Sequence, residues 1–471
     1  MSVTVDHPSV EDRRLHGQEA ATRTPPSSHA GWEPAAGRPD PVALLEEQNV
    51  TREQDLVPVR HGRMMASPFT FYRGAAKIMA SDLSGTPTAG FTTQLCGDAH
   101  LSNFGAFASP ERRLLFDLND FDETLPGPFE YDVKRFAASF TIAARNNGFA
   151  KADARDVTTT SVRAYREAMA AFAQMRTLDT WYAHLAEDDI MAAASARARG
   201  KAAAKELKRA EKNMAKARTR DSLQALSKLT ERVDGMYRIV SQPPVLIPLR
   251  DLAAASYGHA PEEVDRLIHA QFRAYRKTLQ EDRRQLLERF QIVDVARKVV
   301  GVGSVGTRAW IVLLQGRDGQ DPLFLQVKEA SSSVLEDHLP KSRYRQPGER
   351  VVQGQRMMQA ASDIFLGWTR GADVTRQYYW RQLRDMKGSA LVEAMSPSTL
   401  GMYAESCGWT LARAHARSGD AIAIAEYLGD SDSFDRAIYD FSKRYADQNE
   451  QDYQEFVSAV RSGRIPAVEG V

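Results

Sequence analysis

Residues 91–123 decide the fold of this chain, and they read FTTQLCGDAHLSNFGAFASPERRLLFDLNDFDE. The run TTQLC predicts a short strand, which a polar loop, GDAHLSN, separates from a second apolar run, FGAF. After a turn at SPERR the chain returns as LLFDLND, an apolar run that ends in acids. The pattern predicts short strands separated by loops crowded with Asp, Asn and His.

The first loop has the residues for proton transfer and cation binding. Asp98 and Asn103 lie five residues apart after a strand, so both can face one pocket. An aspartate carboxylate can accept the proton of an attacking hydroxyl, and an asparagine amide oxygen can bind Mg²⁺. The alternative is an Asx-rich turn that satisfies its own backbone.

The second loop is strongly acidic. Four carboxylates, those of Asp117, Asp120, Asp122 and Glu123, fall within residues 117–123 and repel one another unless a cation lies among them. Oxygen ligands alone suit a hard ion such as Mg²⁺. The alternative is a solvated acidic turn, against which the flanking apolar residues argue.

Far downstream, GVGSVG at 301–306 places glycines at Gly301, Gly303 and Gly306. A strand, Ala309–Leu314, follows this motif, whereas a dinucleotide-binding turn requires a helix there. The context fits a hairpin that folds over nucleotide phosphates, because glycine lets backbone N–H groups approach phosphate oxygens. A glycine-rich turn without a ligand is the alternative.

Lys328, in LQVKEA, lies near the end of the third strand of this region. A half-buried ammonium needs an anionic partner, and nucleotide phosphates would serve. The alternative is a lysine whose head reaches water at the strand end. A glutamate on the following helix should pair with Lys328; Glu349 is the best placed, and Glu336 and Glu329 remain possible.

Two further groups of polar residues are open to two interpretations. His100 has no His or Cys close in sequence, which favours a structural hydrogen-bonding role over metal binding. Basic residues also cluster before the first loop, and they either bind an anionic substrate or pair with acids; they are Arg60, His61, Arg63 and Arg73.

Composition sets outer limits on the function. The 471 residues carry a net charge of +1, which gives no general argument for nucleic-acid or membrane partners, although residues 197–220 hold ten Lys or Arg and two acids. No apolar run approaches the roughly 18 residues of a membrane span, and residues 1–14 do not resemble a secretory signal. Two cysteines cannot form a disulfide framework. The expectation is a cytoplasmic protein.

The four motifs together resemble the kinase-like phosphotransferases of the aminoglycoside and choline kinase branch, whose catalytic loop reads H-G-D-x-H-x-x-N and whose metal loop reads I-D-F-D. The resemblance implies Asp98 as catalytic base, Asn103 and Asp120, with Asp122, as magnesium ligands, and the glycines with Lys328 as the phosphate grip. It also implies ATP and Mg²⁺ as cofactors, and Asp132 in GPFEYD as a structural acid.

The order of the motifs differs from that branch. Here the glycine loop and lysine follow the catalytic loop by about 200 residues. LARAHARSGD at 411–420 resembles the helix that normally runs into the catalytic loop, yet it lies near the C-terminus. The chain therefore resembles a circularly permuted kinase fold. Cys96 also stands where the branch has histidine.

The chain is also similar to a bacterial domain-of-unknown-function family, number 2252, through GDAHLSNFG, FDLNDFDET, PFEYDVKRFAAS, LQVKEA and RMMQAASDIFLGW. This resemblance covers most of residues 50–460. It supports the motifs and implies no particular reaction.

We expect an α+β, kinase-like two-lobe fold, circularly permuted. Residues 1–40 should be a disordered arm, 41–290 a large lobe with the catalytic and metal loops, 291–386 a five-stranded antiparallel small lobe, and 387–471 helices completing the large lobe. The segment 383–386 should link the lobes past the adenine.

The expected activity is transfer of the γ-phosphoryl group of ATP to a hydroxyl acceptor, a small molecule or a protein. Two alternatives stay open: a nucleotide-binding pseudokinase that regulates a partner, and a nucleotidyl transferase on the same fold. The acceptor and the oligomeric state are not specified by the sequence.

Overall fold

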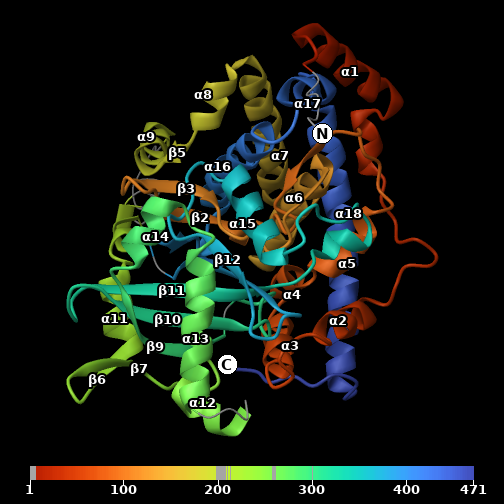
Figure 1. The fold of residues 1–471 in the computed structure, drawn as a ribbon. Coiled ribbons are helices and arrows are strands. Elements are labelled where there is room, and N and C mark those ends of the chain that lie inside the picture. The colour runs from red at the N-terminus through yellow and green to blue at the C-terminus, as the bar shows by residue number, and fades with distance from the viewer. Residues whose placement is uncertain are drawn as a thin grey trace.

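The computed structural model describes residues 7–197, 208, 211–212, 214–256, 261–299, 301–383 and 385–470. These residues form helices and several antiparallel sheets (Figure 1), so the predicted mixture of helix and antiparallel strand is confirmed. Much of the basic stretch 197–220, and residue 384 of the expected linker, lie outside the described residues. Within the described part of the chain, every helix is too short or too polar to cross a membrane.

The largest sheet lies at the lower left of Figure 1 and has six strands in the order β12-β13-β11-β10-β9-β8. Five of these strands come from residues 291–386, where five were predicted. The sixth, β8 (Leu246–Pro248), adds a short edge beside β9. The five are β9 (Gln291–Lys298), β10 (Ala309–Gln315), β11 (Pro322–Ala330), β12 (Gly367–Arg370) and β13 (Gln377–Gln382).

Helices cover both faces of this sheet. Side chains alternate along a strand, so Val327 faces α13 (Pro261–Arg276) together with Trp380. The neighbouring residue, Lys328, is on the opposite face, where its cross-strand partner is Tyr379. Helix α11 (Ser222–Leu229) packs against other residues of β10 and β11. Helix α15 (Pro347–Met358) connects β11 to β12 and contacts the sheet.

Most of the remaining helices lie above and to the right of this sheet in Figure 1, around α6 (Phe129–Asn146), in which every residue from Phe129 to Ala144 is buried. A helix buried on all sides forms the centre of a core rather than a surface layer. The others are α2 (Pro41–Asn49), α3 (Val57–Met65), α4 (Pro68–Gly74), α5 (Ala76–Leu83), α7 (Lys151–Gln174), α8 (Thr177–Tyr182), α9 (Glu187–Arg197), α12 (Leu249–Ser256), α14 (Glu281–Leu287), α16 (Pro397–Ala416), α17 (Ala421–Leu428) and α18 (Ser433–Arg461). Two of them, α12 and α14, lie beside the six-stranded sheet instead.

Small sheets complete the helical part. Strand β1 (Thr92–Leu95) pairs with β4 (Leu125–Pro128), as in the predicted strand before the first polar loop. A second sheet has the order β14-β2-β3-β5, with β2 (Phe104–Ala108) and β3 (Leu114–Leu118) at its centre. Its outer strands are β5 (Leu185–Ala186) and β14 (Gly388–Ser389), and a separate hairpin joins β6 (Thr230–Val233) to β7 (Met236–Ile239).

The prediction of a disordered arm over residues 1–40 is wrong for the described residues from 7 onward. Helix α1 (Val10–Arg23) begins at a Ser9 capping box and packs on α17 (Figure 1), followed by a 3-10 turn, η1 (Pro26–Ala30). His29 is fully buried and bonds the Tyr427 hydroxyl at 2.7 Å. Trp32 packs on Tyr445. The arm is ordered by these distant partners, which its own polar composition does not reveal.

Mild acid should weaken the docking of this arm. Burial, and then the Lys134 charge, lower the pKa of His29 to about 3, whereas the unfolded imidazole titrates near 6.5. As pH falls below 6.5 the unfolded state takes up the proton first, so stability is lost. At pH 5 the loss should be about 2 kcal/mol relative to pH 7.

Urea unfolding at the two pH values measures this loss, with His29→Gln as the comparison because glutamine can still bond Tyr427 but does not titrate. The wild type should lose about 2 kcal/mol more than the variant. An equal loss in both proteins would show that His29 does not control it.

Candidate functional site

The loop Gly97–Asn103 joins β1 to β2 and is fixed on helix α6 by a buried carboxylate. Asp132 accepts the backbone N–H of Cys96 at 2.6 Å and that of Gly97 at 2.9 Å. His415, near the end of α16, approaches the same carboxylate at 3.2 Å. The Cys96 thiol donates to the Asp120 carbonyl at 3.1 Å. Cysteine therefore ties this loop to the acidic loop.

Gly97 is needed at its position for two reasons. Its φ is +83°, a left-handed conformation that favours glycine. A Cβ built there would lie 2.2 Å from the Glu123 carbonyl oxygen, which is backbone and cannot move aside. The backbones of the two loops are thus in direct contact next to Asp98.

Gly97→Ala should therefore destabilise the fold by at least about 2 kcal/mol, measured by urea unfolding. Gly148→Ala is the matched control, because Gly148 has a φ of +72° but open space around its Cβ position. The control should lose only about 1 kcal/mol from backbone strain. Equal losses would show that the contact between the loops contributes nothing.

Asp98 is the second residue of this loop, and its side chain is 21% exposed. Its carboxylate receives a hydrogen bond from the buried Arg135 on α6, which holds it in one orientation. The Asn103 amide nitrogen donates to the Asp98 carbonyl at 2.6 Å. That bond leaves the amide oxygen of Asn103 without a donor among the described residues, so it is available to a cation.

His100 has the structural role expected of it. Its Nδ1 accepts the Ser102 backbone N–H at 3.2 Å. Burial, and then the charges of Arg73 and Arg135, hold the pKa of His100 well below its usual value. The imidazole is therefore neutral, with its Nε2 3.8 Å from the Asp98 carboxylate.

The four acids of residues 117–123 do not act as one cluster. Asp117 is buried and pairs with Arg413 of α16. The Glu123 carboxylate accepts the Val334 backbone N–H at 2.7 Å, and burial raises the pKa of Glu123 to about 7. Asp120, Asp122 and Glu123 all line the same cavity as Asp98. The metal ligands that the resemblance implies in this loop, Asp120 and Asp122, are the two acids that also approach Lys328.

Lys328 reaches these two acids from the six-stranded sheet. Its Nζ donates to the Asp122 carboxylate and lies 3.9 Å from that of Asp120. Burial opposes its charge, but Asp120 and Asp122 outweigh burial and raise the pKa of Lys328 above its usual value. The Tyr379 hydroxyl donates to the other Asp122 oxygen at 2.8 Å. Burial also opposes the charge of Asp122, but Lys328 and Tyr379 lower the pKa of that carboxyl.

The prediction that Glu349 pairs with Lys328 is wrong. Among the described residues, the carboxylates within 4.0 Å of the Lys328 ammonium are those of Asp120 and Asp122. The next residue of α15, Arg350, occupies the inward face, since one step along a helix turns the side chain by about 100°. Its guanidinium donates to the carbonyls of Asp122 and Ser331 at 2.7 and 2.9 Å.

The other two glutamates considered for Lys328 also have different partners. Glu336 lies 3.9 Å from Arg350 and closes a capping box with Ser333. Glu329 pairs with Arg308 at 3.2 Å and with Arg376 at 2.9 Å. Helix α15 is therefore coupled to the acidic loop through Arg350 rather than to Lys328 through a glutamate.

The glycine loop between β9 and β10 closes over the site. Gly301 and Gly303 line the same cavity as Asp98, and Gly301 has a φ of +66°. Gly306 turns the chain at a φ of +85°, and its carbonyl accepts the Glu53 backbone N–H at 2.8 Å. Arg63 donates to the Gly301 carbonyl at 2.6 Å. The loop is thus held against residues 52–63 and carries its first two glycines into the cavity.

The cavity measures about 860 Å³ and brings together most of the predicted site. Its lining comes from both polar loops, the glycine loop, the end of β11 and residues 47–77. The residues with a role implied by the resemblance that line it are Asp98, Asn103, Asp120, Asp122, Gly301 and Gly303. Other residues singled out from the sequence line it as well, namely Arg73, His100, Glu123 and Glu329. Lys328 adjoins them through its ion pair with Asp122, whereas Gly306 and Glu349 are not part of the lining.

The donors available to a metal suit Mg²⁺ only in part. Among the described residues, no three His, Cys, Asp or Glu side chains converge on one point. Mg²⁺ is commonly bound by one or two carboxylates together with substrate phosphates and water. Asp120, Asp122 and the amide oxygen of Asn103 would provide such a partial oxygen set, completed by a nucleotide.

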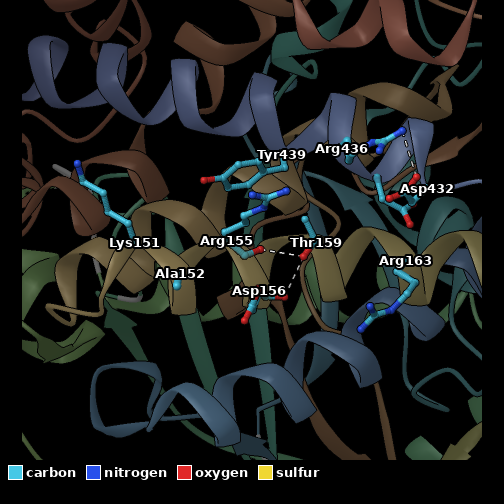
Figure 2. Close-up of a pocket in the computed structure, with 10 residues that line it drawn as sticks. Lys151, Ala152, Arg155, Asp156, Thr159, Arg163, Asp432, Arg436 and Tyr439 are labelled. Atoms are coloured by element: carbon cyan, nitrogen blue, oxygen red, sulfur yellow. Dashed lines mark hydrogen bonds and ion pairs between the residues drawn. The ribbon is translucent and has the colours of Figure 1, made fainter.

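A second hollow, between α7 and α18, has no such chemistry (Figure 2). Two pairs of its side chains interact: Arg436 lies 3.2 Å from Asp432, and Arg155 lies over the Tyr439 ring. None of the residues singled out from the sequence lines it.

Several side chains of the site were not predicted. Arg135, Arg350 and Tyr379 orient Asp98 or Asp122, and Arg52 joins Arg73 in the cavity wall. The sequence carries a signal for two of these residues. Arg135 is an arginine inside an otherwise apolar helix, and Arg350 directly follows Glu349, the acid predicted to pair with Lys328. Arg52 and Tyr379 have no comparable local signal.

Comparison with protein families matches residues 52–459 to the family described as "Uncharacterized protein conserved in bacteria (DUF2252)". Searches of curated proteins and of solved structures found no match. The matched range contains both polar loops, the glycine loop and Lys328. Since the match spans most of the sequence, the predicted resemblance to this family is confirmed, and the chain belongs to the DUF2252 family of bacterial proteins.

Proposed function

We propose that this protein is an ATP- and Mg²⁺-dependent phosphotransferase that moves the γ-phosphoryl group to a hydroxyl acceptor. The observation that carries the proposal is the approach of Lys328 to Asp122, 206 residues away in the chain, beside the cavity that holds Asp98. Phosphoryl transfer needs a base, a set of oxygen ligands, and a phosphate-binding cation with a glycine loop. All three types of group therefore adjoin one cavity.

The order of elements supports a kinase-like lobe. Three strands, a helix and two strands follow one another in residues 291–382, with the glycine loop between the first two and Lys328 on the third. A lysine on the third strand and a glycine-rich loop over the phosphates are features of protein kinases. Asp98 and Asn103 precede the β2–β3 hairpin, and Asp120 and Asp122 follow it.

Circular permutation is supported by the junction between α16 and β1. The Gln94 backbone N–H donates to the Ser418 hydroxyl at 3.0 Å, although the two residues are 324 apart in sequence. Gly419 lies so close to Thr93 that a Cβ would come within 2.6 Å of its methyl group. The end of α16 thus meets the strand that leads into the catalytic loop, where a non-permuted chain would continue directly.

In the proposed reaction the acceptor hydroxyl oxygen forms a bond to the γ-phosphorus while the bond to the β–γ bridging oxygen breaks. Asp98 orients the hydroxyl and takes its proton, and ADP carries away the electron pair of the broken bond. Lys328 and the glycine loop hold the phosphates. Mg²⁺, when bound with the nucleotide by Asp120, Asp122 and Asn103, would neutralise phosphate charge. Most of the catalysis is positioning and charge stabilisation.

Product analysis with ATP labelled at the α or the γ phosphate tests this function in the full-length protein. We expect Mg²⁺-dependent formation of ADP, with the γ label moved to water, to the protein or to an added alcohol. Release of AMP or pyrophosphate would indicate nucleotidyl transfer instead. Nucleotide-dependent stabilisation without turnover would indicate a pseudokinase, and absence of both binding and turnover would exclude all three functions.

A further inference from the structure

We propose that the acceptor carries an anionic group, a phosphate or a carboxylate, and that Arg73 binds this group beside Asp98. The inference rests on the proposed function and adds a substrate class to it. Its basis is a cation in the cavity wall that the described residues leave without a partner.

Arg73, the penultimate residue of α4, lines the cavity with Asp98 and His100. Its Nε is buried and makes no hydrogen bond, and no hydrogen bond or ion pair joins its guanidinium to another described residue. The group lies over the Phe69 ring at 5.9 Å. A largely desolvated charge without a partner is costly, so an anionic ligand at this position would offset that cost.

Three other cations of this wall are paired with acids. Lys77 pairs with Glu47 and Asp337, each at 3.0 Å. Arg308 and Arg376 share Glu329, and Arg376 also lies 3.1 Å from Asp373. These ion pairs leave little charge to attract a ligand, which separates Arg73 from these three cations.

The basic residues singled out before the first loop fall into two groups, those that stabilise the fold and one that lines the cavity. Arg60 is fully buried and donates to Asn49, Gln48 and the Gly74 carbonyl. His61 bonds the Pro466 carbonyl at 2.6 Å. Both serve the fold, and of that cluster Arg73 is the cavity-lining member.

Arg52 is a second cation without a carboxylate partner, but it belongs to the phosphate side of the cavity. It is 8% exposed, donates to the Val305 carbonyl of the glycine loop, and has a buried Nε with no partner. Burial lowers the pKa of Arg52, and the charges of Glu123, Asp122 and Glu329 oppose this shift. Burial also lowers the pKa of Arg73, and there the opposing charges are those of Glu393 and Asp98.

We therefore assign Arg52 and Arg73 to two different anions in the same cavity, the nucleotide and the acceptor. In this proposal the nucleotide phosphates bind at Arg52, Lys328 and the glycine loop, and the acceptor's anionic group binds at Arg73, whose backbone carbonyl adjoins Gly303. A cationic acceptor such as an aminoglycoside or choline would leave the Arg73 guanidinium without a partner. An anionic alcohol is held with its hydroxyl near Asp98.

Inorganic phosphate and acetate serve as probes for the two kinds of anion. Each is titrated calorimetrically into full-length protein saturated with Mg²⁺ and the non-hydrolysable β,γ-imido analogue of ATP, so that the nucleotide phosphate positions are filled. Arg73→Met should weaken binding of the preferred probe about tenfold or more. Arg145→Met, which alters an exposed arginine paired with Asp447, should leave it unchanged.

Stronger binding of phosphate supports a phosphorylated alcohol, and stronger binding of acetate supports a hydroxy acid. Equal affinity in the wild type and Arg73→Met, or no binding of either probe to the wild type, overturns the inference. A parallel loss of nucleotide affinity in Arg73→Met also overturns it, by assigning the residue to the nucleotide. Urea unfolding should show the variant at least as stable as the wild type. Failure of the nucleotide analogue to bind the wild type counts against the proposed function instead, and the probes are then titrated without it.

Discussion

Replacing Asp98 with asparagine should lower the rate of nucleotide turnover by about 10²–10⁴-fold, the usual contribution of a general base. Asparagine keeps an oxygen that can accept the hydrogen bond from Arg135, so the loop should stay in place. It cannot take a proton from the acceptor. Because Asp98 is assigned to the acceptor and not to the nucleotide, affinity for the nucleotide should change little.

Single-turnover formation of ADP from Mg·ATP measures the rate, and titration with the non-hydrolysable analogue measures affinity. Asp156→Asn is the matched control, because Asp156 is an exposed aspartate on α7 in the hollow of Figure 2. Equal rates for the wild type and Asp98→Asn would exclude Asp98 as the base. If Asp98→Asn lowers both the rate and the free energy of unfolding in urea, Asp98 has a structural role instead.

The two polar loops could be predicted from the sequence because their evidence is local. Short apolar runs on either side of GDAHLSN and DLNDFDE fix strand, loop and strand without knowledge of distant residues. The same holds for the glycine turn, where the strand after Gly306 excludes a dinucleotide-binding helix. Strand periodicity also places Lys328 on one face of the sheet. It does not reveal which part of the chain packs against that face.

The pairings that complete the site could not be predicted because they depend on tertiary packing. Lys328 meets Asp122 across 206 residues, and Arg413 meets Asp117 across 296. A sequence pattern shows that a buried lysine needs an anion, but several acids qualify equally well. Spacing along the chain favours Glu349, whereas the phase of α15 turns Arg350 inward. The order of the N-terminal arm is not predictable for a similar reason, since its aromatic partners lie on α17 and α18.

Replacing Lys328 with methionine should have two separable effects. Transfer should fall by at least about 10²-fold, the usual loss when one group that stabilises transition-state charge is removed. The fold should lose about 2 kcal/mol, because the partly buried Asp122 carboxylate then keeps the Tyr379 hydroxyl as its partner among the described residues. Lys151→Met, at an exposed lysine of α7, should change neither quantity.

A second substitution separates these effects. Adding Asp122→Asn to Lys328→Met removes the uncompensated charge, so the double variant should recover most of the lost stability in urea unfolding. Nucleotide turnover should not recover, because the cation that holds the phosphates is still missing and one proposed metal ligand has become an amide. Recovery of turnover together with stability would mean that Lys328 acts only as a structural partner of Asp122. Recovery of neither would mean that the pair does not determine stability, and that methionine disturbs the sheet around Tyr379 by another route.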